Sequence, residues 1–209
     1  MQDILWLPFI IASIAVISIP GQDMMLIMTK SISTGTKAGM LTAAGVSTGL
    51  IVHTIVVSLG LGSLIMASEL LFLTIKIAGA LYLFYLGYQL MRSNGVVAIK
   101  EAGEKKQSWL YLFLYGAISN ISNPKILIFY LAFLPQFVGQ GVGSPVMKIF
   151  CMGLVFAALT FLMKMPVAIF SGILSGWLKR KTSVLKWFMR TSGGLLIFIG
   201  INVLIEKRA

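Results

Sequence analysis

Pro20-Gly21-Gln22-Asp23 interrupts one apolar stretch of this chain, and Asn123-Pro124-Lys125 interrupts another in its second half. Proline lacks a backbone N–H and clashes with the preceding turn, so each stretch is predicted to break there. A helix broken inside lipid leaves backbone groups without partners, and it persists only where protein or a wet cavity shields them. Paired breaks of this kind are typical of the substrate sites of secondary transporters.

The composition makes lipid the outer solvent of the protein. Hydrophobic residues form 58% of the 209 residues and charged residues only 11%, whereas soluble domains average roughly 25% charged residues. A membrane span needs ~20 apolar residues, and six stretches of this length can be drawn. They lie at about 4–28, 39–66, 70–91, 109–135, 146–176 and 187–205. The sequence therefore predicts an all-α integral membrane protein with six transmembrane helices in one domain, 1–209.

The two halves of the chain resemble each other. Lys76–Gly87 and Arg190–Gly200 each begin with a basic residue, have glycine three positions later and end an apolar run with glycine. With three spans per half, the halves must face opposite ways across the membrane. We therefore expect two inverted three-helix repeats, with spans 1 and 4 broken. Repeat one covers about 1–92, a cytoplasmic linker about 93–108, and repeat two about 109–209.

The basic residues predict the orientation of the spans. Eleven of the 17 Lys and Arg residues fall at the loops after spans 1, 3 and 5, and three fall on the opposite side. The positive-inside rule places those three loops in the cytoplasm and both termini outside. This bias accounts for the net charge of +11, and no motif supports binding of nucleic acid.

Asp23 and Lys125 are the charges next to the two breaks. A charge at mid-membrane costs at least ~2.5–3.5 kcal/mol, so each needs compensation. Asp23 is expected to contact a substrate amine or carry a proton, with capping of the half-helix that follows as the alternative. Lys125 is expected to approach Asp23 and bind a substrate carboxylate, with a structural ion pair as the alternative. Asn123 offers its amide to the unwound backbone, and the whole set suits a zwitterion.

Three further ionisable residues lie inside spans. His53 is a candidate proton relay because its reference pKa is near ~6.5, with a packed histidine as the alternative. Lys76 is expected to snorkel or to act at a gate, and Lys164 to line the cavity or snorkel. No metal or other cofactor is expected. The candidates for substrate binding or coupling are therefore Pro20, Gly21, Gln22, Asp23, His53, Asn123, Pro124 and Lys125.

An ordered set of motifs resembles the LysE/RhtB (lysine exporter / homoserine–threonine resistance) family over nearly the whole chain. The set comprises Pro20–Met24, Ser31–Gly39, Gly45-x3-Gly49-x3-His53, Lys76 with Gly79-Ala-Leu-Tyr-Leu and Gly87, Asn123-Pro124-Lys125, and Leu134–Phe137. The resemblance implies an exporter of amino acids or their derivatives in the bacterial inner membrane, driven by the proton gradient. The family usually has a second proline where this chain has Gln22, so the turn here loses a fixed φ angle and gains an amide.

The leading hypothesis is a proton-coupled antiporter that exports an amino acid by alternating access and is not an enzyme. Its expected partners are a small amino acid, protons and the lipid bilayer, with a homodimer as a further expectation. A metal-cation exporter is one alternative and would need more intramembrane acids than Asp23. A membrane electron-transfer protein would need a second cysteine beside Cys151. A non-transporting scaffold would not need Asp23 and Lys125 inside lipid.

Overall fold

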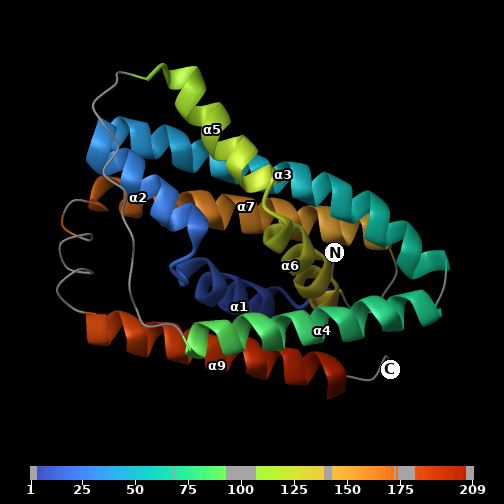
Figure 1. Cartoon of the computed structure of the whole chain (residues 1–209). Helices are drawn as coiled ribbons and strands as arrows, with labels where there is room; N and C mark the ends of the chain where they lie inside the picture. Colours follow the sequence, from blue (N-terminus) through green and yellow to red (C-terminus); the bar gives the residue numbers. More distant parts are fainter. Residues whose placement is uncertain are drawn as a thin grey trace.

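The computed structural model describes residues 4–67, 69–92, 107–138, 143–171, 173 and 182–205. Within these ranges the chain forms eight α-helices and one 3-10 turn, and its only β-type pairing is an isolated bridge between Ile4 and Val138. In chain order the elements are α1 (Trp6–Ser18), α2 (Gln22–Thr34), α3 (Thr36–Ala67), α4 (Glu69–Met91), α5 (Trp109–Ile121), α6 (Pro124–Phe133), η1 (Leu134–Phe137), α7 (Pro145–Ile169) and α9 (Thr182–Ile205), as Figure 1 shows.

Both breaks fall where the prolines predict them. Helices α1 and α2 meet at an angle of 53°, and the segments Trp109–Ile121 and Ile126–Phe137 meet at 59°. Ile19 has an extended backbone (φ −61°, ψ 125°), because a following proline disfavours helical geometry at the preceding residue. Pro124 is the first residue of α6. A backbone N–H at this position would have no partner within the helix, so proline is tolerated there.

The long helices pair in antiparallel fashion. On α3 and α7, Gly39 faces Ala168 and Gly153 faces Thr54; on α4 and α9, Gly87 faces Gly193. In each pair one helix runs forward while the other runs back, as the colours of Figure 1 show. A Cβ at Gly87 would lie 2.6 Å from the carbonyl oxygen of Gly193, so glycine is what permits this close approach.

Two helices described here are each long and apolar enough to cross a membrane, over Thr36–Gly60 and Pro145–Ile169. Each bent pair, α1 with α2 and α5 with α6, adds one more if it is counted as a single span, which gives up to four. The shorter apolar segment Ile77–Met91 follows in α4. The fold is therefore that of an all-α membrane protein, while six spans in two repeats stay a prediction.

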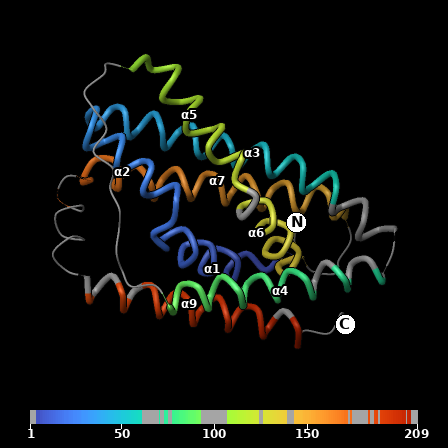
Figure 2. The backbone as a smooth tube through the Cα atoms, viewed as in Figure 1, coloured from blue at the N-terminus to red at the C-terminus, as the bar shows by residue number. Residues whose placement is uncertain are grey.

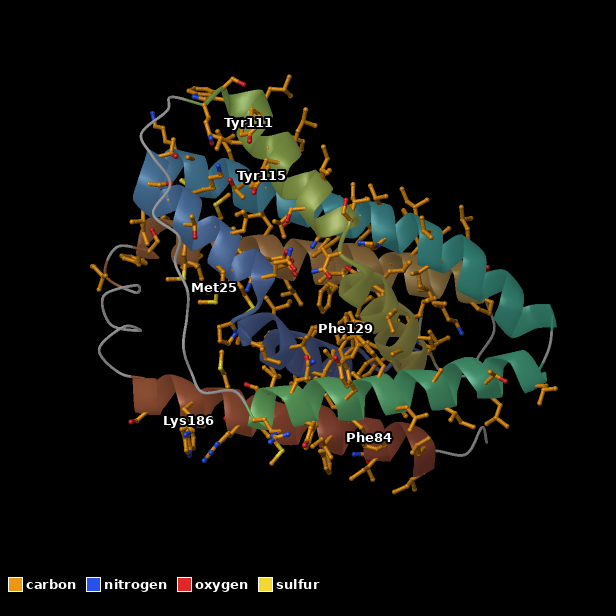
Figure 3. All side chains as sticks on the ribbon, in the orientation of Figure 1. Met25, Phe84, Tyr111, Tyr115, Phe129 and Lys186 are labelled. Carbon is orange, nitrogen blue, oxygen red and sulfur yellow. The ribbon has the colours of Figure 1, made fainter. Side chains whose placement is uncertain are left out.

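The first broken span is longer than the sequence predicted. Helix α2 continues past residue 28 to Thr34 and ends at Gly35, whose φ of 110° favours glycine. Lys30 therefore lies within the helix, and not in the loop where the charge count placed it. Its Nζ donates to Gln107 Oε1 at 2.8 Å and lies 4.8 Å from the ring centre of Tyr115 on α5, labelled in Figure 3. These contacts tie the end of α2 to the start of α5.

Candidate functional site

A cavity of about 430 Å³ lies where the two breaks meet. Its walls come from α1, α2, α3, α4, α6, α7 and α9 together with the first break, and they are mostly apolar. Seven residues with polar side-chain atoms also line it: Gln22, Asp23, Gln89, Asn123, Tyr130, Thr160 and Lys164. A mostly apolar cavity with a few convergent polar groups is the usual form of a small-molecule site.

Helix ends converge on this cavity because both breaks lie near the centre of the molecule. Helices α2 and α6 begin there and run away in opposite directions, as Figures 1 and 2 show. The first N–H groups of a helix have no partner within that helix and carry a partial positive charge. The last carbonyl groups of α1 and α5 are the complementary partial negative charges. The unwound backbone thus supplies both signs of partial charge at one place.

Two side-chain contacts join the breaks. Asn120, in the last turn of α5, donates from Nδ2 to Asp23 Oδ2 at 2.9 Å. Asn123 donates from Nδ2 to Gln22 Oε1 at the longer distance of 3.4 Å. The other carboxylate oxygen of Asp23, Oδ1, is buried without a hydrogen-bond partner among the described residues. An unsatisfied buried acceptor costs about 1–3 kcal/mol, so this oxygen is poised to accept from a ligand.

Lys164 places the second charge in the cavity wall. Its side chain is 6% exposed, and its Nζ donates to the carbonyl oxygen of Ile17 at 2.8 Å. Ile17 is in the last turn of α1, where carbonyl groups lose their helical partners. Lys164 and Asp23 both line the cavity and carry opposite charges. The lysine therefore caps one half-helix and balances the carboxylate that begins the other.

His53 lies one layer behind the cavity. It is 4% exposed on α3, and its Nε2 lies 3.1 Å from the carbonyl oxygen of Asn120. A carbonyl oxygen can only accept, so this nitrogen carries a proton. Asn120 in turn holds Asp23 through its side chain. His53 is thus linked to the carboxylate through a single residue and does not itself line the cavity.

The site residues predicted from the sequence fall into three groups: those that line the cavity, one that lies behind it, and those whose side chains the structure does not describe. Most line the cavity: Pro20, Gly21, Gln22, Asp23, Asn123 and Lys164. His53 lies behind it. The side chains of Lys76, Pro124 and Lys125 lie outside the described part of the structure, so the predicted approach of Lys125 to Asp23 stays a prediction.

The alternative role of Asp23 as a helix cap is wrong. Helix α2 begins at Gln22 with Gly21 at the N-cap, and no side chain caps it. Asp23 instead lies in the first turn of the helix, where a negative charge is stabilised by the helix dipole.

Sequence reasoning missed Asn120, Thr160 and Tyr130. Asn120 precedes Asn123 by three residues, a spacing that puts both amides on one face at the end of a helix. Thr160 likewise precedes Lys164 by four residues on α7, and both line the cavity. Tyr130 is fully buried beside the cavity, and its hydroxyl has no hydrogen-bond partner within the described residues. These two spacings were the available signals for Asn120 and Thr160, and no spacing pointed to Tyr130.

Aromatic side chains close one end of the cavity. Phe129 and Phe156 line it, and Phe129 lies centrally in Figure 3. Behind them, Phe133 packs against Phe129 with ring centres 4.8 Å apart and against Phe137 at 4.9 Å. Phe9 of α1 completes the group, 5.4 Å from Phe137. We call Phe9, Phe129, Phe133, Phe137 and Phe156 the aromatic cluster.

The opposite end of the cavity reaches the surface. Gln22 and Gln89 line the cavity and are exposed. Gln89 is in the last turn of α4, two residues before the helix ends at Met91. The cavity wall therefore includes exposed side chains beside the end of α4.

Broken apolar helices around a cavity with a few convergent polar groups are the arrangement typical of membrane transport proteins. The described residues contain no group of three His, Cys, Asp or Glu side chains that could hold a metal ion. The chain belongs to the LysE type translocator family, whose family model matches residues 4–207.

Curated relatives agree with this assignment. The chain is 31% identical over 200 residues to the uncharacterized membrane protein YrhP of Bacillus subtilis (strain 168), which covers 92% of this chain and 94% of the relative. It is 35% identical over 133 residues to the homoserine/homoserine lactone efflux protein of Salmonella typhimurium, covering 64% of each chain. It is also 29% identical over 210 residues to the uncharacterized membrane protein PA4757 of Pseudomonas aeruginosa, covering 93% and 91%. No solved structure matches the chain.

Proposed function

We propose that the protein is a secondary transporter that exports a small amino acid or its derivative across the bacterial inner membrane. The observation that carries this proposal is the cavity at the two helix breaks, in which Asp23 and Lys164 present opposite charges. A solute with both an ammonium and a carboxylate group complements such a pair. The relative named as a homoserine/homoserine lactone efflux protein supports the same class of solute and the outward direction.

Six spans in two inverted repeats are the arrangement that fits this proposal. The antiparallel pairing of α3 with α7 and of α4 with α9 supports it, since each pair joins corresponding spans of the two halves. The matching positions of the two breaks support it further. In this arrangement the basic segment after α4 faces the cytoplasm, and both termini lie outside.

We assign the described conformation to the cytoplasm-facing state of the alternating-access cycle that we propose. The cavity is accessible beside the end of α4, which precedes the basic linker. The aromatic cluster closes the other end, between α1, α6, η1 and α7. Release of the substrate outside then requires these rings to separate while the cytoplasmic end closes.

Coupling to protons is assigned to Asp23, with His53 as its relay. A free carboxylate oxygen can take up either a proton or the ammonium group of the substrate, and not both at once. Asn120 accepts from His53 through its backbone carbonyl and holds the Asp23 carboxylate through its side-chain amide, so it fixes the positions of both groups without itself carrying a proton. Lys125, the second residue of α6, is proposed as a further group that the substrate meets near the second break.

Reconstitution into liposomes tests the function directly. The purified protein should move homoserine against its gradient when a proton gradient is imposed, and collapsing the proton gradient should abolish uphill movement. Asp23→Asn should lose coupled transport, whereas Glu101→Gln, in the predicted linker, should retain it. Full coupled transport by the Asp23→Asn variant would rule out the role given to this carboxylate.

A further inference from the structure

We propose that Lys164 binds the carboxylate of the transported amino acid while Asp23 Oδ1 accepts from its ammonium group. This inference rests on the proposed function and narrows it, because it makes a free carboxylate a requirement for strong binding. It also gives the carboxylate-binding role to α7 of the second half, and not to Lys125 beside the break.

The position of Lys164 supports a ligand role beyond helix capping. An ammonium group has three donors, and the contact with Ile17 uses one of them. The side chain lies on the wall of the cavity although it is almost fully buried. Charge-assisted hydrogen bonds to a carboxylate are about twice as strong as neutral ones. A carboxylate in the cavity can therefore accept a hydrogen bond from another N–H group of Lys164, whose position is fixed by the contact with Ile17.

Asp23 supplies the opposite end of the site. Its Oδ2 is held by Asn120 at 2.9 Å, so the carboxylate has a fixed orientation. Its Oδ1 is buried and lacks a hydrogen-bond partner within the described residues. A substrate ammonium group would satisfy this oxygen. Lys164 lines the same cavity as Asp23, so the two ends of a small zwitterion can each meet a side chain of opposite charge.

The chain provides a matched control for the burial of a lysine. Lys148 is also on α7 and is 5% exposed, close to the 6% of Lys164, but it does not line the cavity. Replacing Lys148 perturbs a buried amine on the same helix without changing the cavity. Any effect that is specific to Lys164 then reports on the cavity.

Homoserine and homoserine lactone are the probes for the test. Both carry an ammonium group, but ring closure converts the carboxylate of homoserine into a neutral ester. We expect Lys164→Gln to lower the apparent affinity for homoserine roughly 10- to 100-fold, the usual effect of losing a charge-assisted bond. Transport of the lactone should change little. Lys164→Arg should restore much of the preference for homoserine, and Lys148→Gln, outside the cavity wall, should leave the preference as it is.

Other outcomes overturn the inference in distinct ways. Equal losses for homoserine and the lactone in Lys164→Gln would make the lysine a helix cap only. Loss of the preference in Lys125→Gln would move the role to that residue. If the Lys164 variants fail to reach the membrane, competition in the unmodified protein decides: a lactone that displaces labelled homoserine as well as homoserine does overturns the proposal. Absence of transport of either compound by the unmodified protein would instead contradict the proposed function.

Discussion

Removing the ring of Phe133 should open the cavity toward the outside. Phe133 is fully buried and contacts four other rings of the aromatic cluster, with centres 4.8–6.0 Å apart. Each such ring pair contributes about 0.5–1.5 kcal/mol beyond its burial. At the lower limit, four ring pairs contribute about 2 kcal/mol to the stability of the closed conformation. Losing this contribution in Phe133→Ala should raise the fraction of protein in the outward-open conformation roughly 30-fold.

Labelling of a cysteine in the cavity measures this shift. Cys151 is replaced by serine, and Gln22→Cys, at an exposed position of the cavity wall, becomes the reporter. A membrane-impermeant thiol reagent applied from outside should then react faster in Phe133→Ala. Phe198→Ala is the matched control, because Phe198 is 62% exposed on α9 and lies outside the aromatic cluster. An unchanged external rate in correctly inserted Phe133→Ala would refute the assignment of these rings as the outer closure.

Two other substitutions probe the packing and the site. Gly87→Ala should lower stability by about 1–3 kcal/mol, because the new Cβ would lie 2.6 Å from the carbonyl oxygen of Gly193. Gly194→Ala, which meets nothing within 4 Å, should be neutral in the same thermal unfolding assay, and equal melting temperatures for the two variants would contradict the close crossing. Asn120→Ala should weaken homoserine binding roughly tenfold, since hydrogen bonds to charged groups contribute about 1.5–3 kcal/mol. An unchanged apparent affinity in transport assays would show that Asn120 does not orient Asp23.

The breaks could be predicted from the sequence because proline acts locally. Pro20 and Pro124 each disrupt the backbone within one turn, whatever the rest of the chain does. Asp23 could be predicted for a similar reason, since a carboxylate in an apolar stretch is costly wherever the helix lies. These features need no knowledge of how the helices pack.

The partners of Asp23 could not be predicted because they depend on packing between distant helices. Asn120 reaches Asp23 because α5 crosses close to α3 and brings its last turn to the first break. Lys164 reaches the end of α1 from a helix more than a hundred residues later in the chain. Adjacency to a break favoured Lys125 in the sequence, whereas the described wall of the cavity carries Lys164. Local patterns thus locate the cavity but do not identify every group that lines it.

The charges of the cavity offer a reason why substrate and proton can move in opposite directions. Among the described lining residues, Asp23 and Lys164 carry the charges and balance each other. A bound zwitterion leaves this balance unchanged, so the empty and loaded cavities have equal net charge. A proton on Asp23 removes the acceptor for the substrate ammonium, so proton and substrate compete for one oxygen. External protons should therefore raise the apparent KM for external homoserine without lowering its maximal exchange rate. A purely non-competitive effect would place the proton site away from Asp23.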